Sequence, residues 1–243
     1  MVIALKHTRW QDAIELPKGW GVNALISDPP YSDKVQAGHN AGAEGHLGDG
    51  KDTAERRSID YAHWGSDDVH EFCRAWSPIV SGWFCALTDH VLFPVYAEVL
   101  EELGRYVFQP IPCVIRGMTV RLGGDGPSGW AVYMVAARPK NRTMATWGTL
   151  PGSYMGPREV CPVIGGKPEW LMSAIIRDYT RPGDTIVDPC AGGATTLLCA
   201  DALGRNAFGM EMDAATYAIA QARLDERARM GVQHDLFSGA THG

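Results

Sequence analysis

Four consecutive residues, Asp28-Pro29-Pro30-Tyr31, carry the groups in this chain that are best suited to chemistry. They follow the apolar run 22–26, so a carboxylate, two prolines and an aromatic ring come at the end of a predicted strand. Neither proline can continue a sheet or a helix, and both fix the backbone there. Asp28 and the Pro29 carbonyl then form adjacent acceptors for an amino group on an aromatic ring, and Tyr31 offers that ring a flat surface. An ordinary strand-to-loop turn uses the same residue types, so a second motif is needed.

The second motif lies in residues 182–196, which predict a short strand, a loop of small residues and a helix. Asp188 ends the strand, and the small residues that follow let the backbone approach a ligand closely. A further strand, 206–210, ends in Glu211 about 20 residues on, the spacing at which dinucleotide-binding units place an acid on ribose hydroxyls. No Lys-Ser or Lys-Thr pair follows the loop, which excludes a phosphate-binding P-loop.

The two motifs together resemble the DNA amino-methyltransferases that use S-adenosylmethionine, and specifically the β group, in which Asp-Pro-Pro-Tyr precedes the cofactor motif. Residues 166–171 resemble the Lys-Pro segment that heads the helix before the cofactor strand, and 183–224 follow the family pattern. The chain departs from that pattern at Cys190, where Phe is usual, and at Ala194, where Gly is usual. Val163-Ile164-Gly165-Gly166 stands in place of His-Pro-Thr-Gln.

The resemblance implies methyl transfer from S-adenosylmethionine to N6 of an adenine that has been flipped out of DNA. The implied catalytic residues are Asp28, Pro29, Pro30 and Tyr31. The implied cofactor-binding residues are Asp12, Asp28, Lys167, Pro168, Asp188, Pro189, Cys190, Gly192, Thr195, Thr196 and Glu211.

Three alternatives stay open beside adenine methylation. Cytosine N4 methylation uses the same chemistry, although related enzymes more often carry Ser where Asp28 stands. Cytosine C5 methylation needs a Pro-Cys nucleophile, which Pro112-Cys113 superficially supplies, but that dipeptide lies in an apolar strand and leaves residues 28–31 without a role. The third alternative is not an enzyme but a catalytically idle DNA-binding or cofactor-sensing module.

Composition agrees with an enzyme that is soluble and cytoplasmic. The chain has 243 residues, of which 45% are hydrophobic, and no apolar stretch of about 18 residues or signal-peptide pattern. Its six cysteines are widely spaced, and we predict no metal site. The net charge is −6, yet basic residues cluster between 105 and 167. We expect phosphate contacts from Arg116, Arg121, Arg138, Lys140, Arg142 and Arg158.

The order of motifs predicts an α/β, Rossmann-like methyltransferase fold in circular arrangement. The sheet is expected to be mostly parallel with one reversed edge strand and helices on both faces. Residues 1–243 are predicted to form a single catalytic domain with a loop insertion at about 33–65 and a short DNA-contact region at about 117–161, of which 139–161 is irregular. Little room remains for a target-recognition domain, so recognition should be short or weak. A homodimer is possible.

Overall fold

The computed structural model describes residues 1–12, 21–35, 63–116, 131–141 and 147–238, and only the backbone of 231–238. Among these residues no helix is long and apolar enough to cross a membrane. The strands are β1 (Ile3–His7), β2 (Ala24–Ser27), β3 (Phe84–Thr88), β4 (Arg105–Val107), β5 (Ile111–Arg116), β6 (Val132–Pro139), β7 (Tyr154–Pro157), β8 (Thr185–Asp188) and β9 (Asn206–Glu211). The helices are η1 (Trp10–Asp12), α2 (Ser66–Trp76), α3 (Phe93–Glu102), α4 (Glu169–Tyr179), α5 (Thr195–Ala202) and α6 (Ala214–Ser238).

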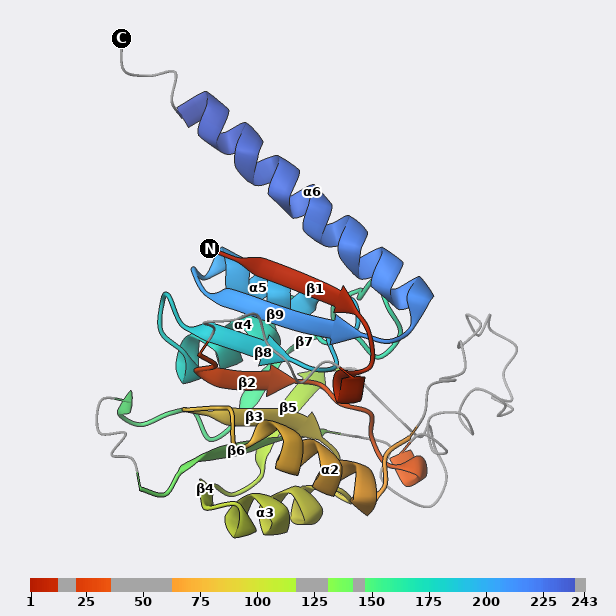
Figure 1. Cartoon of the computed structure of the whole chain (residues 1–243), viewed down its shortest axis with the longest axis vertical. Helices are drawn as coiled ribbons and strands as arrows, with labels where there is room; N and C mark the ends of the chain where they lie inside the picture. Colours follow the sequence, from red (N-terminus) through yellow and green to blue (C-terminus); the bar gives the residue numbers. More distant parts are fainter. Residues whose placement is uncertain (13–20, 36–62, 117–130, 142–146, 239–243) are drawn as a thin grey trace.

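All of the described strands join one sheet in the order β1-β9-β8-β2-β3-β6-β5-β7, with β4 also paired to β6 (Figure 1). The pairs from β1 through β3 are parallel, as is β5 with β7. We call the side of the sheet where these parallel strands end the carboxyl edge, and the opposite side the amino edge. The catalytic strand β2 lies directly beside β8, so both motifs end at the carboxyl edge.

The reversed strand is β6, and its position corrects the prediction. Its partners β3, β4 and β5 all run antiparallel to it, and β3 lies on one side with β4 and β5 on the other. The reversed strand is therefore inside the sheet, because β5 and β7 continue the sheet beyond it. Strand β7 was not expected, since residues 139–161 were predicted to be irregular.

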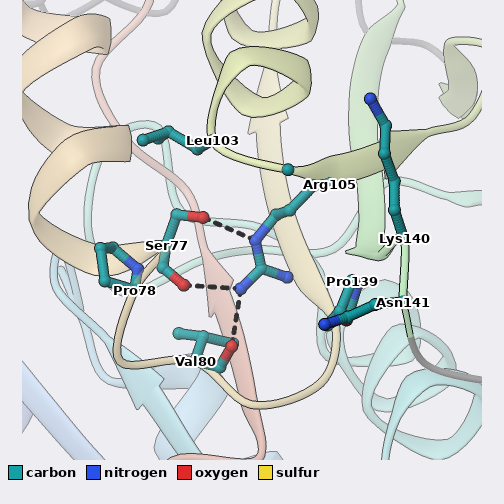
Figure 2. Close-up of a pocket in the computed structure, with 9 residues that line it drawn as sticks. Ser77, Pro78, Val80, Leu103, Arg105, Pro139, Lys140 and Asn141 are labelled. Carbon is teal, nitrogen blue, oxygen red and sulfur yellow. Dashed lines mark hydrogen bonds between the residues drawn. The ribbon is translucent and has the colours of Figure 1, made fainter.

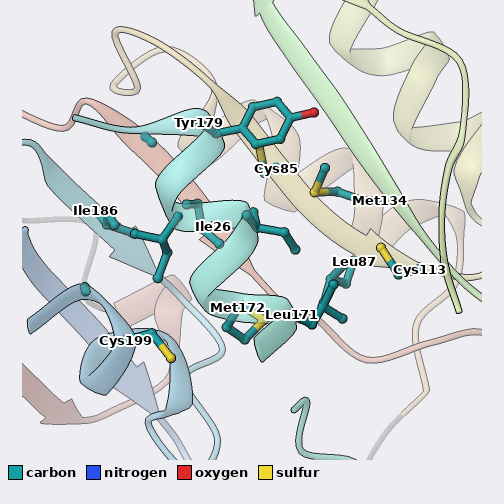
Figure 3. Packing of buried hydrophobic residues seen from close by; sticks show 14 of the residues in the cluster. Ile26, Cys85, Leu87, Cys113, Met134, Leu171, Met172, Tyr179, Ile186 and Cys199 are labelled. Atoms are coloured by element: carbon teal, nitrogen blue, oxygen red, sulfur yellow. The ribbon is translucent and has the colours of Figure 1, made fainter. Parts of the chain in front are cut away.

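Helices cover both faces of the sheet, as predicted, and side-chain alternation in the strands explains why. In β2, Ala24 and Ile26 face the core beneath α4 and α5, whereas Leu25 faces the core beneath α2 and α3. Figure 3 shows the first core, where Leu171, Met172 and Tyr179 of α4 lie over the sheet. A strand that is buried on both faces needs an unbroken apolar sequence, which 24–26 supplies.

Candidate active site

The Asp28 side chain lies at the end of β2, at the carboxyl edge, and both of its oxygens are engaged. The Tyr31 hydroxyl donates a hydrogen bond to Asp28 Oδ1 at 2.8 Å. The Lys167 ammonium lies 2.5 Å from Asp28 Oδ2. The Asp28 side chain keeps 23% of its surface exposed, so an incoming polar group can reach it. The structure thus brings the four predicted catalytic residues and Lys167 together.

Asp188 lies at the end of the neighbouring strand and is fully buried. Its Oδ1 accepts hydrogen bonds from the Ser27 hydroxyl at 2.7 Å and from the Cys190 amide at 3.1 Å. Burial raises the pKa of Asp188 to about 6, against the opposing effect of hydrogen bonds from Thr196, Ser27 and Cys190. The carboxyl group therefore anchors the start of the small-residue loop to the catalytic strand.

The loop after β8 has the backbone shape that its small residues permit. Gly192 and Ala194 both have left-handed φ values, of +51° and +63°. The αL conformation favours glycine at such positions, which gives a physical reason for the glycine usual before Thr-Thr. A Cβ at Gly192 would meet nothing within 4 Å, so open space lies over this part of the loop.

Glu211 closes the loop from the end of β9. Its Oε2 accepts from the Gly192 amide at 3.0 Å, and its Oε1 accepts from the Asp213 amide at 2.7 Å. Burial raises the pKa of Glu211, while these amides act in the opposite direction. Glu211, Gly192 and Asp188 therefore line one continuous stretch of the carboxyl edge.

Arg223 braces the same loop from α6. Its guanidinium donates to the Gly193 carbonyl, to Thr195 Oγ1 at 3.4 Å and to Glu169 Oε1 at 3.3 Å. The segment that departs from the family pattern also packs here, since a Cβ at Gly193 would lie 3.1 Å from Val163. Thr195 and Thr196 begin α5 and are buried. Cys190 contacts the core beneath α2 and α3, and burial raises the pKa of its thiol.

The remaining predicted cofactor residues also lie at the carboxyl edge. Asp12 is exposed in η1, which follows β1, and β1 pairs with β9 so that His7 lies opposite Glu211. Pro189 is buried between Asp188 and the loop. Pro168 is the N-cap residue of α4, which places Lys167 just before the helix, with its ammonium on Asp28.

Cys113 is a poor candidate for a covalent nucleophile. The residue is 1% exposed in β5, and burial raises the pKa of its thiol to about 12. The thiolate is the reactive form of cysteine, so this thiol is inert near neutral pH. The structure supports setting the C5 alternative aside.

The predicted DNA-binding residues divide between the two edges of the sheet. Arg116 ends β5 and Arg158 follows β7, so both are exposed at the carboxyl edge near the site. Arg138 and Lys140 come at the end of the reversed strand β6 and lie at the amino edge. Arg138 stacks over the Tyr106 ring at 5.1 Å. Arg121 and Arg142 lie outside the described residues.

Arg105, another member of the basic cluster between 105 and 167, has a structural role (Figure 2). It is 3% exposed and donates to Ser77 Oγ, to the Ser77 and Val80 carbonyls, and to the Gly82 carbonyl, at 2.6–2.8 Å. These acceptors follow the C-terminus of α2, where a cation is favourable. Burial lowers the pKa of Arg105 to about 10. Lys140 lines a pocket beside it, far from Asp28 along the strands.

One residue at the carboxyl edge was missed by the sequence reasoning. Asp89 follows β3 and is fully buried. Its Oδ2 accepts from the Ser32 amide at 2.7 Å, and its Oδ1 accepts from the Val91 and Leu92 amides at 2.7 and 3.0 Å. It therefore ties the chain just after Tyr31 to the start of α3. An aspartate at the end of an apolar strand, as at Asp28 and Asp188, was the available signal.

Comparison with known proteins shows that part of this site is similar to a known family. Residues 164–222, from just before Lys167 to the first half of α6, match a family model described as DNA methylase. Residues 164–222 are therefore similar to the DNA methylase family. This segment contains Asp188, the small-residue loop and Glu211, while Asp28 lies upstream of it.

Similarity to curated proteins covers short stretches of the chain. The chain is 40% identical over 60 residues to Type II methyltransferase M.HinfI of Haemophilus influenzae, which is 25% of this chain and 17% of that protein. It is 41% identical over 59 residues to DNA adenine methyltransferase YhdJ of Escherichia coli K12, or 24% of this chain and 20% of that protein. The matched stretch thus spans less than a quarter of each relative.

The similarity of the fold extends over nearly the whole chain. The crystal structure of an M1.HpyAVI–SAM complex superposes with a TM-score of 0.67, covering 92% of this chain and all of that chain at 20% identity. The chain therefore has a Rossmann-like methyltransferase fold.

Proposed function

We propose that this protein transfers the methyl group of S-adenosylmethionine to N6 of adenine in DNA. The observation that carries the proposal is the direct link between the two motifs. Asp28 follows Ser27, whose hydroxyl bonds to Asp188 at 2.7 Å, and Asp188 heads the small-residue loop. An acceptor for an amino group and a candidate cofactor cradle therefore share one rigid edge of the sheet.

The residues at this edge fit S-adenosylmethionine. Open space lies over Gly192, and the carboxylate of Glu211 beside it can accept hydrogen bonds from ribose hydroxyls. We assign cofactor binding to Asp12, Asp28, Lys167, Pro168, Asp188, Pro189, Cys190, Gly192, Thr195, Thr196 and Glu211. When bound, the cofactor supplies a methyl group on a positively charged sulfur.

Asp28 and the Pro29 carbonyl orient the target amino group by accepting its hydrogens. Withdrawal of these hydrogens from the plane of the ring leaves the nitrogen lone pair available for attack. Tyr31 supports the ring by stacking, and Pro29 and Pro30 hold the acceptors in place. Fixed positioning of the reacting groups supplies a large part of the acceleration. The base must leave the helix, at a cost of a few kcal/mol for unstacking.

Adenine is favoured over cytosine by two observations. Asp28 stands where cytosine N4 enzymes resembling this chain more often carry Ser. The curated relative YhdJ is named an adenine methyltransferase. Cytosine N4 is the second candidate because the same acceptors serve its exocyclic amino group.

DNA is the proposed partner, contacted through phosphates by the cations at the carboxyl edge. Arg116 and Arg158 are exposed there, on the same side of the sheet as Asp28. We further propose that the chain forms one cytoplasmic catalytic domain and a homodimer. Sedimentation of the purified protein tests the dimer, and a monomer at all concentrations would contradict it.

Transfer of isotope-labelled methyl groups tests the proposed activity. The purified protein is incubated with methyl-labelled S-adenosylmethionine and with DNA, RNA or protein as acceptor. We expect label in DNA, and none after Asp28→Ala. Cofactor binding without transfer to any acceptor would instead support the idle cofactor-sensing module.

A further inference from the structure

Lys167 occupies the place that the target amino group needs. Its ammonium lies 2.5 Å from Asp28 Oδ2 and 4.9 Å from the centre of the Tyr31 ring. The side chain is only 5% exposed. The other oxygen, Asp28 Oδ1, already accepts from the Tyr31 hydroxyl. An amino group that enters over the Tyr31 ring to bond with Asp28 therefore meets the Lys167 ammonium, which lies both on the carboxylate and over that ring.

Asp28 has contacts with Lys167 and with Tyr31, and the contact with Lys167 must break before a base can stack on the Tyr31 ring. Because the ammonium lies over the Tyr31 ring, it covers the aromatic face as well as the carboxylate oxygen. Lys167 also donates to the Gly165 carbonyl at 2.9 Å. That second partner lies on its own loop, so the ammonium can leave Asp28 while one hydrogen bond is kept.

The charge of the methyl donor gives a reason for Lys167 to move. In a reactive complex the methyl carbon lies about 3 to 3.5 Å from the attacking nitrogen. The ammonium of Lys167 now stands near the position of that nitrogen, so a bound sulfonium would place a second cation close to it. Like charges repel strongly in a partly buried site. Asp28 can then balance the sulfonium charge in place of Lys167.

We propose that Lys167 keeps target bases out of the pocket until a positively charged methyl donor is bound. The inference rests on the proposed function. Lys167 holds Asp28 and covers Tyr31 first, the donor charge expels it, and the freed carboxylate and ring then accept the base. Transfer forms the N–C bond and breaks the C–S bond, which leaves a neutral thioether and moves the positive charge to the amino nitrogen. Once that nitrogen has lost a proton to solvent, no donor charge remains, so Lys167 returns to Asp28 and favours release of the product. The enzyme is thereby ordered to take the donor before the base.

Two donor analogues separate the effect of charge from the effect of shape. Sinefungin carries an ammonium in place of the transferred methyl group, on a carbon that replaces the sulfur, whereas S-adenosylhomocysteine has a neutral sulfur and no such group. The DNA is a pool of labelled duplexes with one adenine opposite an abasic site between randomised bases, since an unpaired base is easily extruded. A matched pool carries purine, which lacks the amino group. Fluorescence anisotropy gives the dissociation constant for the adenine pool and for the purine pool. Their ratio, called here the preference for adenine, reports the contact between the amino group and Asp28.

With the unaltered protein, we expect the preference for adenine over purine to be at least fivefold larger with sinefungin than with S-adenosylhomocysteine, within the usual range of coupling between sites. In Lys167→Met, which keeps length and packing, the preference should be equally large with both analogues. Lys140→Met, at the amino edge, should behave like the unaltered protein. If the unaltered protein shows the same preference for adenine with both analogues, that result alone would overturn the proposal. An unchanged difference between the analogues in Lys167→Met would overturn it as well.

Calorimetry separates failure of this inference from failure of the proposed function. If neither analogue binds, the proposed function falls, and the role of Lys167 falls with it. If both bind and methyl transfer to DNA occurs but the analogues give the same preference, only the role of Lys167 is wrong. If Lys167→Met weakens binding of both analogues equally and leaves the difference in base preference intact, Lys167 binds the cofactor but does not exclude the base.

Discussion

The hydroxyl of Ser27 donates a 2.7 Å hydrogen bond to the carboxylate of Asp188, although the two residues lie 161 positions apart. The bond is buried and joins the strand that presents Asp28 to the strand that presents the small-residue loop. Parallel pairing of β2 with β8 makes it possible, because both strands end at the same edge. The geometry of the candidate site thus depends on sheet topology, and the predictions below test its parts.

Asp28 and Cys113 distinguish the two kinds of methyl-transfer chemistry. Asp28→Asn should reduce turnover at least about 100-fold, because the amino group loses a charged acceptor, while S-adenosylmethionine still binds. Cys113→Ser should retain transfer, since the thiol is buried and protonated. Turnover and calorimetry on both variants provide the measurement. A folded but inactive Cys113→Ser protein would reinstate covalent chemistry.

Glu211→Gln tests the ribose contact. Hydrogen bonds to a charged group contribute about 1.5 to 3 kcal/mol each, so affinity for S-adenosylmethionine should fall about tenfold or more. Asp213→Asn is a matched control, because Asp213 is a neighbouring acid that is fully exposed. Isothermal calorimetry measures both variants. Unchanged affinity in Glu211→Gln would remove Glu211 from the site.

DNA affinity should depend on the basic residues of one edge only. Replacing Arg116 and Arg158 with Ala should weaken binding to every sequence and lower the slope of log K against log salt by about 0.9 for each lost phosphate contact. Replacing Arg138 and Lys140 with Ala should leave both quantities unchanged, because these residues lie at the amino edge. Salt titrations by anisotropy decide between the edges, and the reverse pattern would contradict the assignment.

Asp188 should make stability depend on pH. Its folded pKa of about 6 is above the ordinary value of 3.8, so the folded state binds this proton more tightly. The resulting stabilisation is complete below about pH 3.8 and is lost as the pH rises through about 6. Between pH 5 and 7 the unaltered protein should therefore lose stability relative to Asp188→Asn. Melting curves test this, with Asp67→Asn on the exposed start of α2 as control. Parallel pH profiles for all three proteins would count against a titrating Asp188.

Sequence recognition should be short. Each mismatched base pair costs only about 1 to 3 kcal/mol, and the expected recognition loops can supply few base contacts. Long-read mapping of methylated DNA from cells that express the protein measures the recognised sequence. A sharply defined site of six or more base pairs would contradict this expectation and leave the chemistry untouched.

The catalytic and cofactor motifs were predictable because local sequence determines them. The apolar residues 24–26 and 186–187 are followed by Asp28 and Asp188, and parallel strands bring such endings together. The direction and position of a strand within the sheet are non-local properties, which is why the reversed strand was predicted at the edge of the sheet and Arg138 was grouped with Arg116. Burial of Arg105 against the carbonyls after α2 was equally unpredictable, since three of its acceptors are backbone carbonyl oxygens.

The contact between Lys167 and Asp28 shows the same limit. The Lys-Pro segment was predicted to support the cofactor. Its ion pair with Asp28 was not predicted, because the two residues lie 139 positions apart in the sequence. Asp89 is a different case. Its position after an apolar strand was visible in the sequence, but its hydrogen bond to the Ser32 amide could not be predicted from it.

Nucleoside mass spectrometry is the most direct test of methyl transfer to N6 of adenine in DNA. DNA is incubated with the purified protein and S-adenosylmethionine bearing a deuterated methyl group, and is then digested to nucleosides. We expect deuterated N6-methyladenine from the unaltered protein and none from the Asp28→Asn variant. Deuterated N4-methylcytosine as the main product, or no labelled nucleoside at all from a protein that binds the cofactor, would contradict the proposed function.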